Sequence, residues 1–187
     1  GNLASAGLVR ARLERRLEES VHLDGMTGVF NRRYFESRLV TEIDRARRAE
    51  RPLALLLFHI LDFKALNENH GYEKGDLVLR DLATFLKEHV RTEDVIARYG
   101  QDEFLVLLTG GATQEEALRV ADKLREKVAS RDLGGLPADR VQIRAGLVWQ
   151  PHEALERDGL HHLVELVLER SKQAGSDRVV SDPDPLA

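Results

Sequence analysis

The sequence contains no cysteine, one methionine and one tryptophan among its 187 residues. Without cysteine, the chain can form neither a disulfide framework nor a thiolate metal site. It also has no apolar run near the roughly 18 residues that a membrane helix needs, and no secretory signal pattern. Its net charge of −4 leaves no excess of positive charge for nucleic acid. We therefore expect a cytoplasmic protein with no membrane segment and no nucleic-acid partner.

The composition is that of a folded domain, with 42% hydrophobic and 32% charged residues. We expect three parts, namely an N-terminal signalling or linker helix at 1–22, one domain at 23–181, and a disordered tail at 182–187. A domain of this length can bury a sizeable core, so it needs no metal for stability.

Apolar residues recur at every fourth position in the N-terminal part, at Leu13, Leu17 and Val21. Such a stripe is too narrow to bury itself and favours pairing with a second helix. We expect this helix to join the domain to an upstream sensor. The alternative is a frayed leader.

Apolar periodicity and turn residues predict alternating helices and strands over the rest of the chain. The run at 53–60 is almost entirely apolar, which suits a strand buried on both faces. A polar stretch follows at 62–74, in which we expect Gly71 and Gly75 to be turn residues. The other expected elements are helices at 32–49 (capped by Asn31), 75–90, 114–128 (after a Thr113–Glu116 capping box) and 160–174, and strands at 95–99, 103–108, 141–149 and 178–180. These elements predict an α/β or α+β fold in which helices surround a central mixed sheet with an antiparallel hairpin.

Two acidic residues, Asp102 and Glu103, directly follow the hairpin turn. Carboxylates on a turn stand clear of the sheet and can hold a hard cation, although acidic hairpin tips are also common on ordinary surfaces. A second polar segment, with Lys64, Asn67 and Asp76, follows the buried strand. The two segments meet only if their strands are neighbours, which spacing alone does not decide.

Five separated segments, taken in order, resemble the motifs of the GGDEF family of diguanylate cyclases. They are an opening motif at 24–35, a nucleotide-binding stretch at 63–76, Arg91 to Asp94, the turn at 100–104, and Lys172 with Gly175. The resemblance covers about 24–180 and implies the GGDEF fold, which is like the palm of class III nucleotide cyclases. It also implies that two GTP molecules, one on each domain of a homodimer, condense to cyclic di-GMP with the help of a cation.

The resemblance also implies roles for individual residues, which fall into three groups. The implied groups are Lys64, Asn67, Asp76 and Lys172 for nucleotide binding, Asp102 and Glu103 for catalysis, and Asp102, the Ile60 backbone and position 59 as ligands of the Mg²⁺ that accompanies GTP.

Four positions depart from the family pattern. His59 replaces an acidic metal ligand, and Mg²⁺ prefers hard oxygen ligands to imidazole. Leu61 replaces a second aspartate, and Ser176 replaces a phosphate-binding arginine. Gln101 replaces a glycine, which would permit a positive φ and close backbone approach to a ligand. We interpret the acidic pair as vestigial and His59 as a poor metal ligand, the rival interpretations being a zinc or manganese ligand or an ordinary, partly buried histidine.

The Arg91-x-x-Asp94 segment keeps the motif with which this family binds its product away from the active site. The Arg91 guanidinium can grip guanine O6 and N7, and Asp94 can accept from the N1 and N2 hydrogens of guanine. The alternative is a local surface ion pair. Arg119, Arg125 or Arg144 could hold the second face of the ligand, and the sequence does not choose between them.

We therefore interpret the chain as a degenerate, catalytically inactive GGDEF domain that acts as a cyclic di-GMP receptor in bacterial second-messenger signalling and requires no cofactor for that role. One alternative is an active diguanylate cyclase that makes cyclic di-GMP from two GTP. Another is a GTP-binding, dimerisation or docking module without catalysis.

Overall fold

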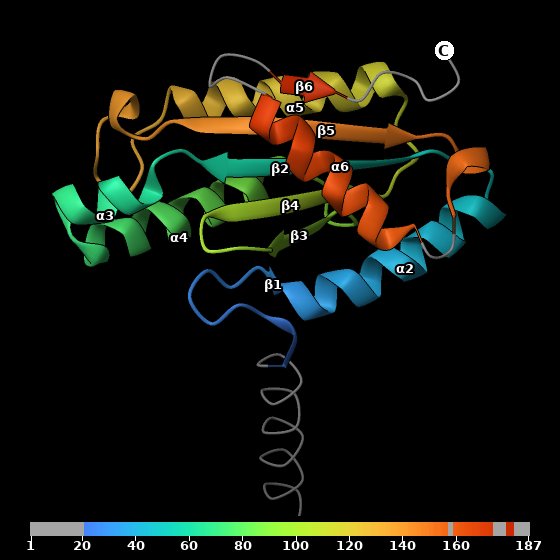
Figure 1. The fold of residues 1–187 in the computed structure, drawn as a ribbon, viewed down its shortest axis with the longest axis horizontal. Helices are drawn as coiled ribbons and strands as arrows, with labels where there is room; N and C mark the ends of the chain where they lie inside the picture. The colour runs from blue at the N-terminus through green and yellow to red at the C-terminus, as the bar shows by residue number, and fades with distance from the viewer. Residues whose placement is uncertain (1–20, 157–158, 174–178, 182–187) are drawn as a thin grey trace, which may run out of the picture.

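The computed structural model describes residues 21–156, 159–173 and 179–181, so nearly all of the expected N-terminal helix and the expected tail lie outside the described residues. Within these residues, six strands form one mixed sheet in the order β1-β3-β4-β2-β5-β6 (Figure 1). The three inner pairs are antiparallel and the two edge pairs are parallel. The strands are β1 (Phe30–Asn31), β2 (Leu53–Ile60), β3 (Val95–Arg98), β4 (Glu103–Leu108), β5 (Ile143–Gln150) and β6 (Val179–Ser181). The predicted mixed sheet with an antiparallel hairpin is confirmed.

Helices cover both faces of this sheet. Buried residues of α4 and α5 pack on one face, and those of α2 and α6 pack on the other. The helices are α2 (Arg32–Arg48), α3 (Phe63–His70), α4 (Tyr72–His89), α5 (Gln114–Ala129) and α6 (Leu160–Gln173), with short 3-10 helices η1 (Ala138–Arg140) and η2 (His152–Ala154).

Strand β2 lies at the centre of the sheet and is buried on both faces, as its continuous apolar sequence predicts. Leu55 and Leu57 belong to the core under α2 and α6, whereas Leu56 and Phe58 belong to the core under α4 and α5. Each such side chain contributes roughly 1.5–3 kcal/mol when fully buried. The position of β2, and therefore of the residues at its end, is strongly determined.

Two of the predicted helix starts are confirmed in atomic detail. The Asn31 side chain accepts a hydrogen bond of 2.9 Å from the Tyr34 N–H at the start of α2. At the start of α5, the Thr113 hydroxyl accepts from the Glu116 N–H and the Glu116 carboxylate accepts from the Thr113 N–H. Both caps satisfy backbone donors that the first turn of a helix leaves unpaired.

The polar stretch at 62–74, for which the sequence pattern predicted no helix, contains α3 and the start of α4. Gly71 is the turn residue between the two helices, with a φ of 86°. Gly75 is instead buried inside α4, where an added Cβ would overlap the Asn67 side chain. The glycine therefore serves the close approach of α3 rather than a turn.

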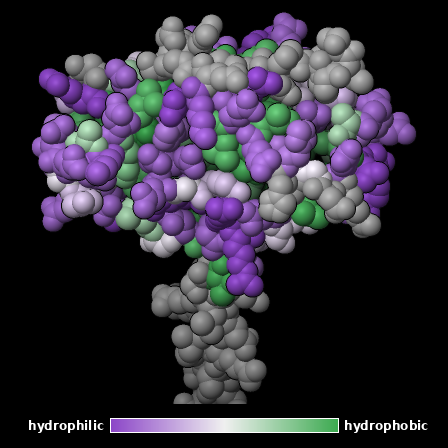
Figure 2. Space-filling model, viewed as in Figure 1, coloured by the Kyte–Doolittle hydropathy of each residue, from purple (hydrophilic) through white to green (hydrophobic). Residues whose placement is uncertain are grey.

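The visible face of the molecule carries mainly hydrophilic side chains, with smaller hydrophobic patches between them (Figure 2). Among the described residues, no helix is both long enough and apolar enough to cross a membrane.

Helix α6 lies directly on the backbone of β5 at Gly146. A Cβ added to Gly146 would come within 2.6 Å of the Ser171 N–H nitrogen and 2.7 Å of the Val167 carbonyl oxygen. Both atoms belong to the helix backbone and cannot rotate away. The absence of a side chain at this position therefore sets the distance between α6 and the sheet.

We predict that Gly146→Ala lowers the free energy of unfolding by about 1–3 kcal/mol, because α6 must shift away from β5. Thermal unfolding followed by circular dichroism should show a melting temperature lower by about 2–4 °C for each kcal/mol. Gly25→Ala is the matched control, since a Cβ there would meet no heavy atom within 4 Å. Equal melting temperatures for the two variants would contradict the tight contact.

Candidate functional site

The turn between β3 and β4 carries the acidic pair. The Tyr99 N–H donates to the Glu103 carbonyl at 2.8 Å and closes the turn. A Cβ on Gly100 would come within 2.5 Å of the Glu103 carboxylate, so a side chain there would push that carboxylate aside. Among the described non-glycine residues, a positive φ occurs only at Glu50 and Asp62. Gln101 therefore fits the turn without backbone strain, and the positive φ that a glycine would permit at this position is not used.

The end of β2 lies beside this turn, as the family resemblance implied. In the sheet register, His59 is opposite Glu103 of β4 on one side and opposite Arg144 of β5 on the other. The His59 Nε2 atom lies 3.3 Å from Asp102 Oδ2. The Arg144 Nε–H donates to His59 Nδ1 at 3.0 Å. Asp102, His59 and Arg144 thus form one hydrogen-bonded row across the ends of three strands.

The protonation of the imidazole follows from its neighbours. A guanidinium has only donors, so His59 Nδ1 must accept and Nε2 must carry the proton that points to Asp102. Neither ring nitrogen then has a lone pair available for a cation.

The ligand set implied for Mg²⁺ therefore does not fit this arrangement. Asp102 supplies one carboxylate, and the Ile60 backbone is adjacent because its N–H donates to the Asp102 carbonyl at 3.0 Å. The third position is the occupied imidazole of His59. In the part of the chain that the structure describes, no three histidine, aspartate or glutamate side chains are grouped to hold a metal ion. The same occupancy argues against zinc or manganese at His59.

The residues implied for guanine lie on α3 and α4. Asn67 Oδ1 is buried between the two helices without a hydrogen-bond partner among the described residues. Asp76 follows Gly75 in α4 and is half-buried. A buried acceptor without a partner is costly, so it marks a place where a ligand donor would be stabilising.

The two lysines implied for phosphate binding are exposed. Lys64 is 91% exposed and lies 3.8 Å from Glu68 on the next turn of α3. Lys172 is in the last turn of α6, next to Ser171. Gly175 and Ser176 lie outside the described residues, so the closing motif and the missing arginine stay predictions.

The Arg91 and Asp94 segment lies at the other end of β4. One Asp94 carboxylate oxygen accepts from the Arg91 N–H and the other accepts from the Thr109 N–H, both at 3.1 Å. Burial raises the pKa of Asp94, and these two hydrogen bonds offset the rise only in part. The Arg91 guanidinium lies over Gly110 and forms no hydrogen bond or ion pair with the described residues. The alternative of a simple ion pair between the two side chains is therefore not what the structure shows.

A pocket of about 300 Å³ opens beside this segment. Its wall includes Arg91, Asp94 and Lys87, together with Gly28 of the entry loop and Phe30 of β1. Since Glu103 begins β4 and Thr109 follows its end, the pocket and the acidic turn are separated by the length of a six-residue strand. That length is about 20 Å. The molecule thus has two distinct candidate sites.

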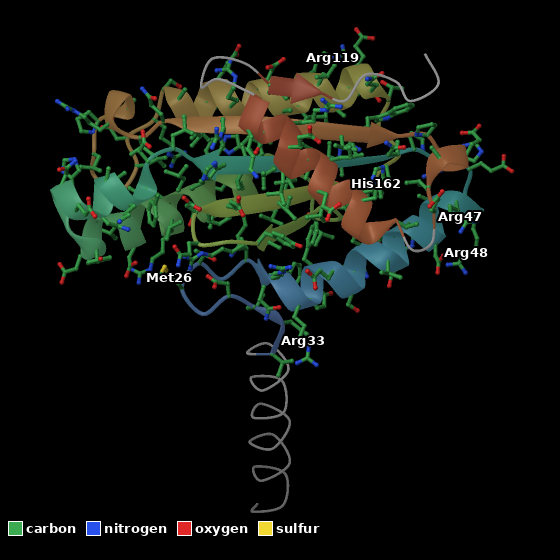
Figure 3. All side chains as sticks on the ribbon, viewed as in Figure 1. Met26, Arg33, Arg47, Arg48, Arg119 and His162 are labelled. Atoms are coloured by element: carbon green, nitrogen blue, oxygen red, sulfur yellow. The ribbon has the colours of Figure 1, made fainter. Side chains whose placement is uncertain are left out.

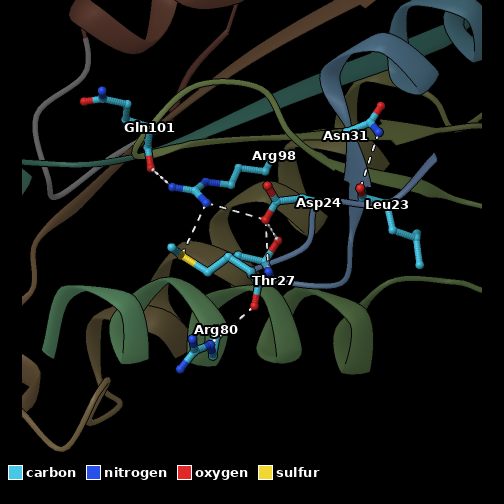
Figure 4. A network of polar contacts seen from close by, with 8 residues as sticks. Leu23, Asp24, Thr27, Asn31, Arg80, Arg98 and Gln101 are labelled. Carbon is cyan, nitrogen blue, oxygen red and sulfur yellow. Dashed lines mark hydrogen bonds and ion pairs between the residues drawn. The ribbon is translucent and has the colours of Figure 1, made fainter. Parts of the chain in front are cut away.

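Arg98, the last residue of β3, connects the loop that enters the domain to the acidic turn, as Figure 4 shows. The Arg98 guanidinium donates to the Gln101 carbonyl at 2.7 Å and lies 3.5 Å from the Asp24 carboxylate. Asp24 Oδ1 also accepts from the Thr27 N–H and hydroxyl at 2.9 and 2.7 Å. The Gln101 amide group extends away from Arg98 (Figure 4).

The pKa of Asp24 reflects these contacts. Burial alone would raise the pKa, but the hydrogen bonds from Thr27 and the charge of Arg98 outweigh burial and place it below its usual range. The ionised form of Asp24 is therefore the one that the fold stabilises.

Sequence reasoning missed Arg98 and the contact of Arg144 with His59. The Asp24-x-x-Thr27 spacing is typical of a side chain that caps its own turn, and it could have predicted the Asp24–Thr27 hydrogen bonds but not the contacts of Arg98. No local pattern signals the arginines, because each meets its partner only after the sheet forms.

Comparisons with known proteins agree with this geometry. The family model described as "Diguanylate cyclase, GGDEF domain" matches residues 21–178. The probable diguanylate cyclase DgcC of Escherichia coli is 34% identical over 169 residues, which cover 90% of this chain and 45% of DgcC. Diguanylate cyclase DosC of the same species is 30% identical over 175 residues, which cover 92% of this chain and 37% of DosC. The chain thus spans less than half the length of these relatives.

Solved structures with the same fold include two GGDEF domains. The coiled coil and GGDEF domain of DgcB from Caulobacter crescentus, in complex with c-di-GMP, matches with a TM-score of 0.81 at 23% identity, over 96% of this chain and 97% of that chain. At that identity the likeness supports the fold alone. The GGDEF domain of YfiN (TpbB) from Pseudomonas aeruginosa matches with a TM-score of 0.71 at 29% identity, over 84% of this chain and 99% of that chain.

We predict that Asp24→Asn lowers the free energy of unfolding by about 1–2 kcal/mol at pH 7, because the charge opposite Arg98 is lost. The folded-state pKa of Asp24 is lowered, so its contribution is present above about pH 4 and is lost as the pH falls through the folded-state value. Urea unfolding at pH 7 and below pH 4 should show the difference between the two proteins shrinking with acid. The control variant Glu88→Gln, on the exposed face of α4, should have the same free energy of unfolding as the wild type at both pH values. A difference in free energy of unfolding between wild type and Asp24→Asn that does not change with pH would contradict this account.

Proposed function

The chain belongs to the GGDEF diguanylate cyclase family, and from that membership we propose that it is a degenerate member which binds cyclic di-GMP and does not synthesise it. The observation that carries the proposal is the row formed by Asp102, His59 and Arg144. Its imidazole and guanidinium take the place where the family's reaction needs a second acidic ligand for the cation. Without that ligand, the charge of two triphosphates is too poorly neutralised for one to attack the other.

The pocket beside Arg91 and Asp94 supports the binding role. The Arg91 guanidinium is available to a guanine base or a phosphate, and the Asp94 carboxylate is held in place by two backbone hydrogen bonds. Arg144, one of three candidates for the second face of the ligand, faces His59 and so belongs to the other site. We therefore propose cyclic di-GMP, which is bound in the DgcB structure, as the ligand of this pocket.

The signal would leave the pocket through the loop that begins the domain. Gly28 and Phe30 line the pocket, and Lys87, which also lines it, donates from Nζ to the Gly28 carbonyl. The same loop carries Asp24, which contacts Arg98. A ligand in the pocket would therefore contact the segment that follows the expected signalling helix. Through that helix, the bound ligand would influence an upstream sensor and a second copy of the chain.

A second candidate function is an active cyclase, with Mg²⁺ brought in with GTP. It is favoured by the unstrained backbone of Gln101, whose amide group extends away from Arg98, and by the partnerless Asn67 oxygen, which suits a guanine. It requires Asp102 to release the His59 imidazole before Asp102 and the Ile60 backbone can hold the ion.

We predict that isothermal titration calorimetry shows cyclic di-GMP binding to the purified chain. Arg91→Ala should weaken this binding by about tenfold or more, since a charge-assisted contact to a base or phosphate is lost. Arg47→Ala is the matched control, because Arg47 is exposed on α2 (Figure 3) and does not line the pocket. Equal affinities for wild type and Arg91→Ala would refute the proposed pocket.

We also predict that the chain forms no cyclic di-GMP from GTP and Mg²⁺ in an assay read by liquid chromatography. Product that appears in the wild type and disappears in Glu103→Ala would establish the cyclase instead. Product that persists in Glu103→Ala points to a contaminating enzyme, and the assay is then repeated on repurified protein.

A further inference from the structure

Arg144 lies beside the acidic turn, at the end of β2. Arg144, His59 and Glu103 are directly opposite one another on β5, β2 and β4. Residues that are opposite one another point to the same face of a sheet. The site at the end of β2 therefore carries a fixed positive charge, in line with His59 and Glu103.

His59 determines how this charge is presented. Its Nε2–H is held by Asp102 and its Nδ1 accepts the Nε–H of Arg144, so the plane of the guanidinium is oriented by the imidazole. The terminal nitrogens of Arg144 form no hydrogen bond or ion pair with the described residues. A guanidinium used at Nε alone keeps a pair of parallel donors that suits a phosphate.

A second cation lies near the same place. Gly146 is two residues along β5 from Arg144, on the same face, and the backbone of α6 contacts it at Ser171. Lys172 is the next residue of that helix and is exposed. The last turn of α6 thus adds positive charge on the side of the sheet where Arg144 projects.

We propose that Arg144, positioned by His59, does for a bound phosphate what a divalent cation would otherwise do, so that the cleft binds guanine nucleotides such as GTP without metal. The same contacts of His59 explain both features, because the imidazole occupies the place of a Mg²⁺ ligand and also holds the Arg144 guanidinium there. The partnerless Asn67 oxygen favours guanine as the base, since the N1 and N2 hydrogens of guanine are donors. The inference does not depend on cyclic di-GMP binding at Arg91.

The test is calorimetric titration of GTP into the purified chain, in EDTA and again in excess Mg²⁺. The expected result is binding in EDTA, with a Kd that changes by less than about threefold in Mg²⁺, because the phosphate charge is met by Arg144. Arg144→Ala should weaken binding in EDTA by about tenfold or more. Arg144→Lys keeps the charge without the two-pronged donor and should lie between the two, which guards against a folding defect in the alanine variant. Arg47→Ala, at the opposite end of the sheet, should match the wild type (Figure 3).

His59 is a positioning residue in this proposal, and its variant has a readout that a merely structural role would not move. His59→Asp places a second carboxylate beside Asp102 and should weaken GTP binding in EDTA while making it respond to Mg²⁺ by about tenfold or more. Three results would overturn the proposal, namely no GTP binding in EDTA, wild-type binding that requires Mg²⁺, or an unchanged affinity in Arg144→Ala. Titration of cyclic di-GMP into the same variants separates these failures from failure of the Arg91 pocket, since that pocket lies at the other end of β4.

Discussion

The burial of β2 on both faces is the constraint on which the rest of the structure depends. Its leucines contact two separate layers of helices, so the strand can neither slide nor turn without exposing one of them. A slip of one residue would send every side chain to the opposite face. The end of β2 is therefore fixed, and with it the register of His59 against Glu103 and Arg144. Helix α3, which carries Asn67, begins three residues after that end.

The chemistry of the cleft follows from which charges this rigid end presents. A carboxylate at position 59 would add a hard ligand and a negative charge, whereas the imidazole adds neither and links Asp102 to a guanidinium. In the proposal made above, this difference turns the preference of the site from cations towards anions. The Arg91 pocket is at the far end of β4 and shares no residue with this row. A change in the cleft can therefore leave the pocket intact, and the two sites are open to separate selection and separate measurement.

Much of the fold could be predicted from local sequence. The apolar run of β2, the Asn31 cap, the Thr113–Glu116 capping box and the hairpin are all encoded within a few residues, and each is confirmed. Helix α3 was missed because its polar composition hides the single buried leucine, Leu66, on which it packs. β1 was missed because two residues carry no periodicity.

The candidate site was less predictable than the fold. The positions of its residues along the chain were clear, but their partners were not. Arg144 is 85 residues from His59 in sequence and Arg98 is 74 residues from Asp24. Contacts of that range depend on strand order, which the residue pattern leaves open. The family resemblance supplied the strand order, but the substituted positions, where the resemblance ends, are where the structure was needed.

The sharing of Arg98 between the Asp24 carboxylate and the Gln101 carbonyl has a mechanical consequence. The Arg98 guanidinium limits relative motion of the loop at Asp24 and the hairpin turn at Gln101, because this one planar group contacts both. The parallel pairing of β1 with β3 adds a second tie a few residues away. A torque applied ahead of Asp24 is then carried to the tip as rotation of one stiff unit, without being dissipated in a compliant hinge.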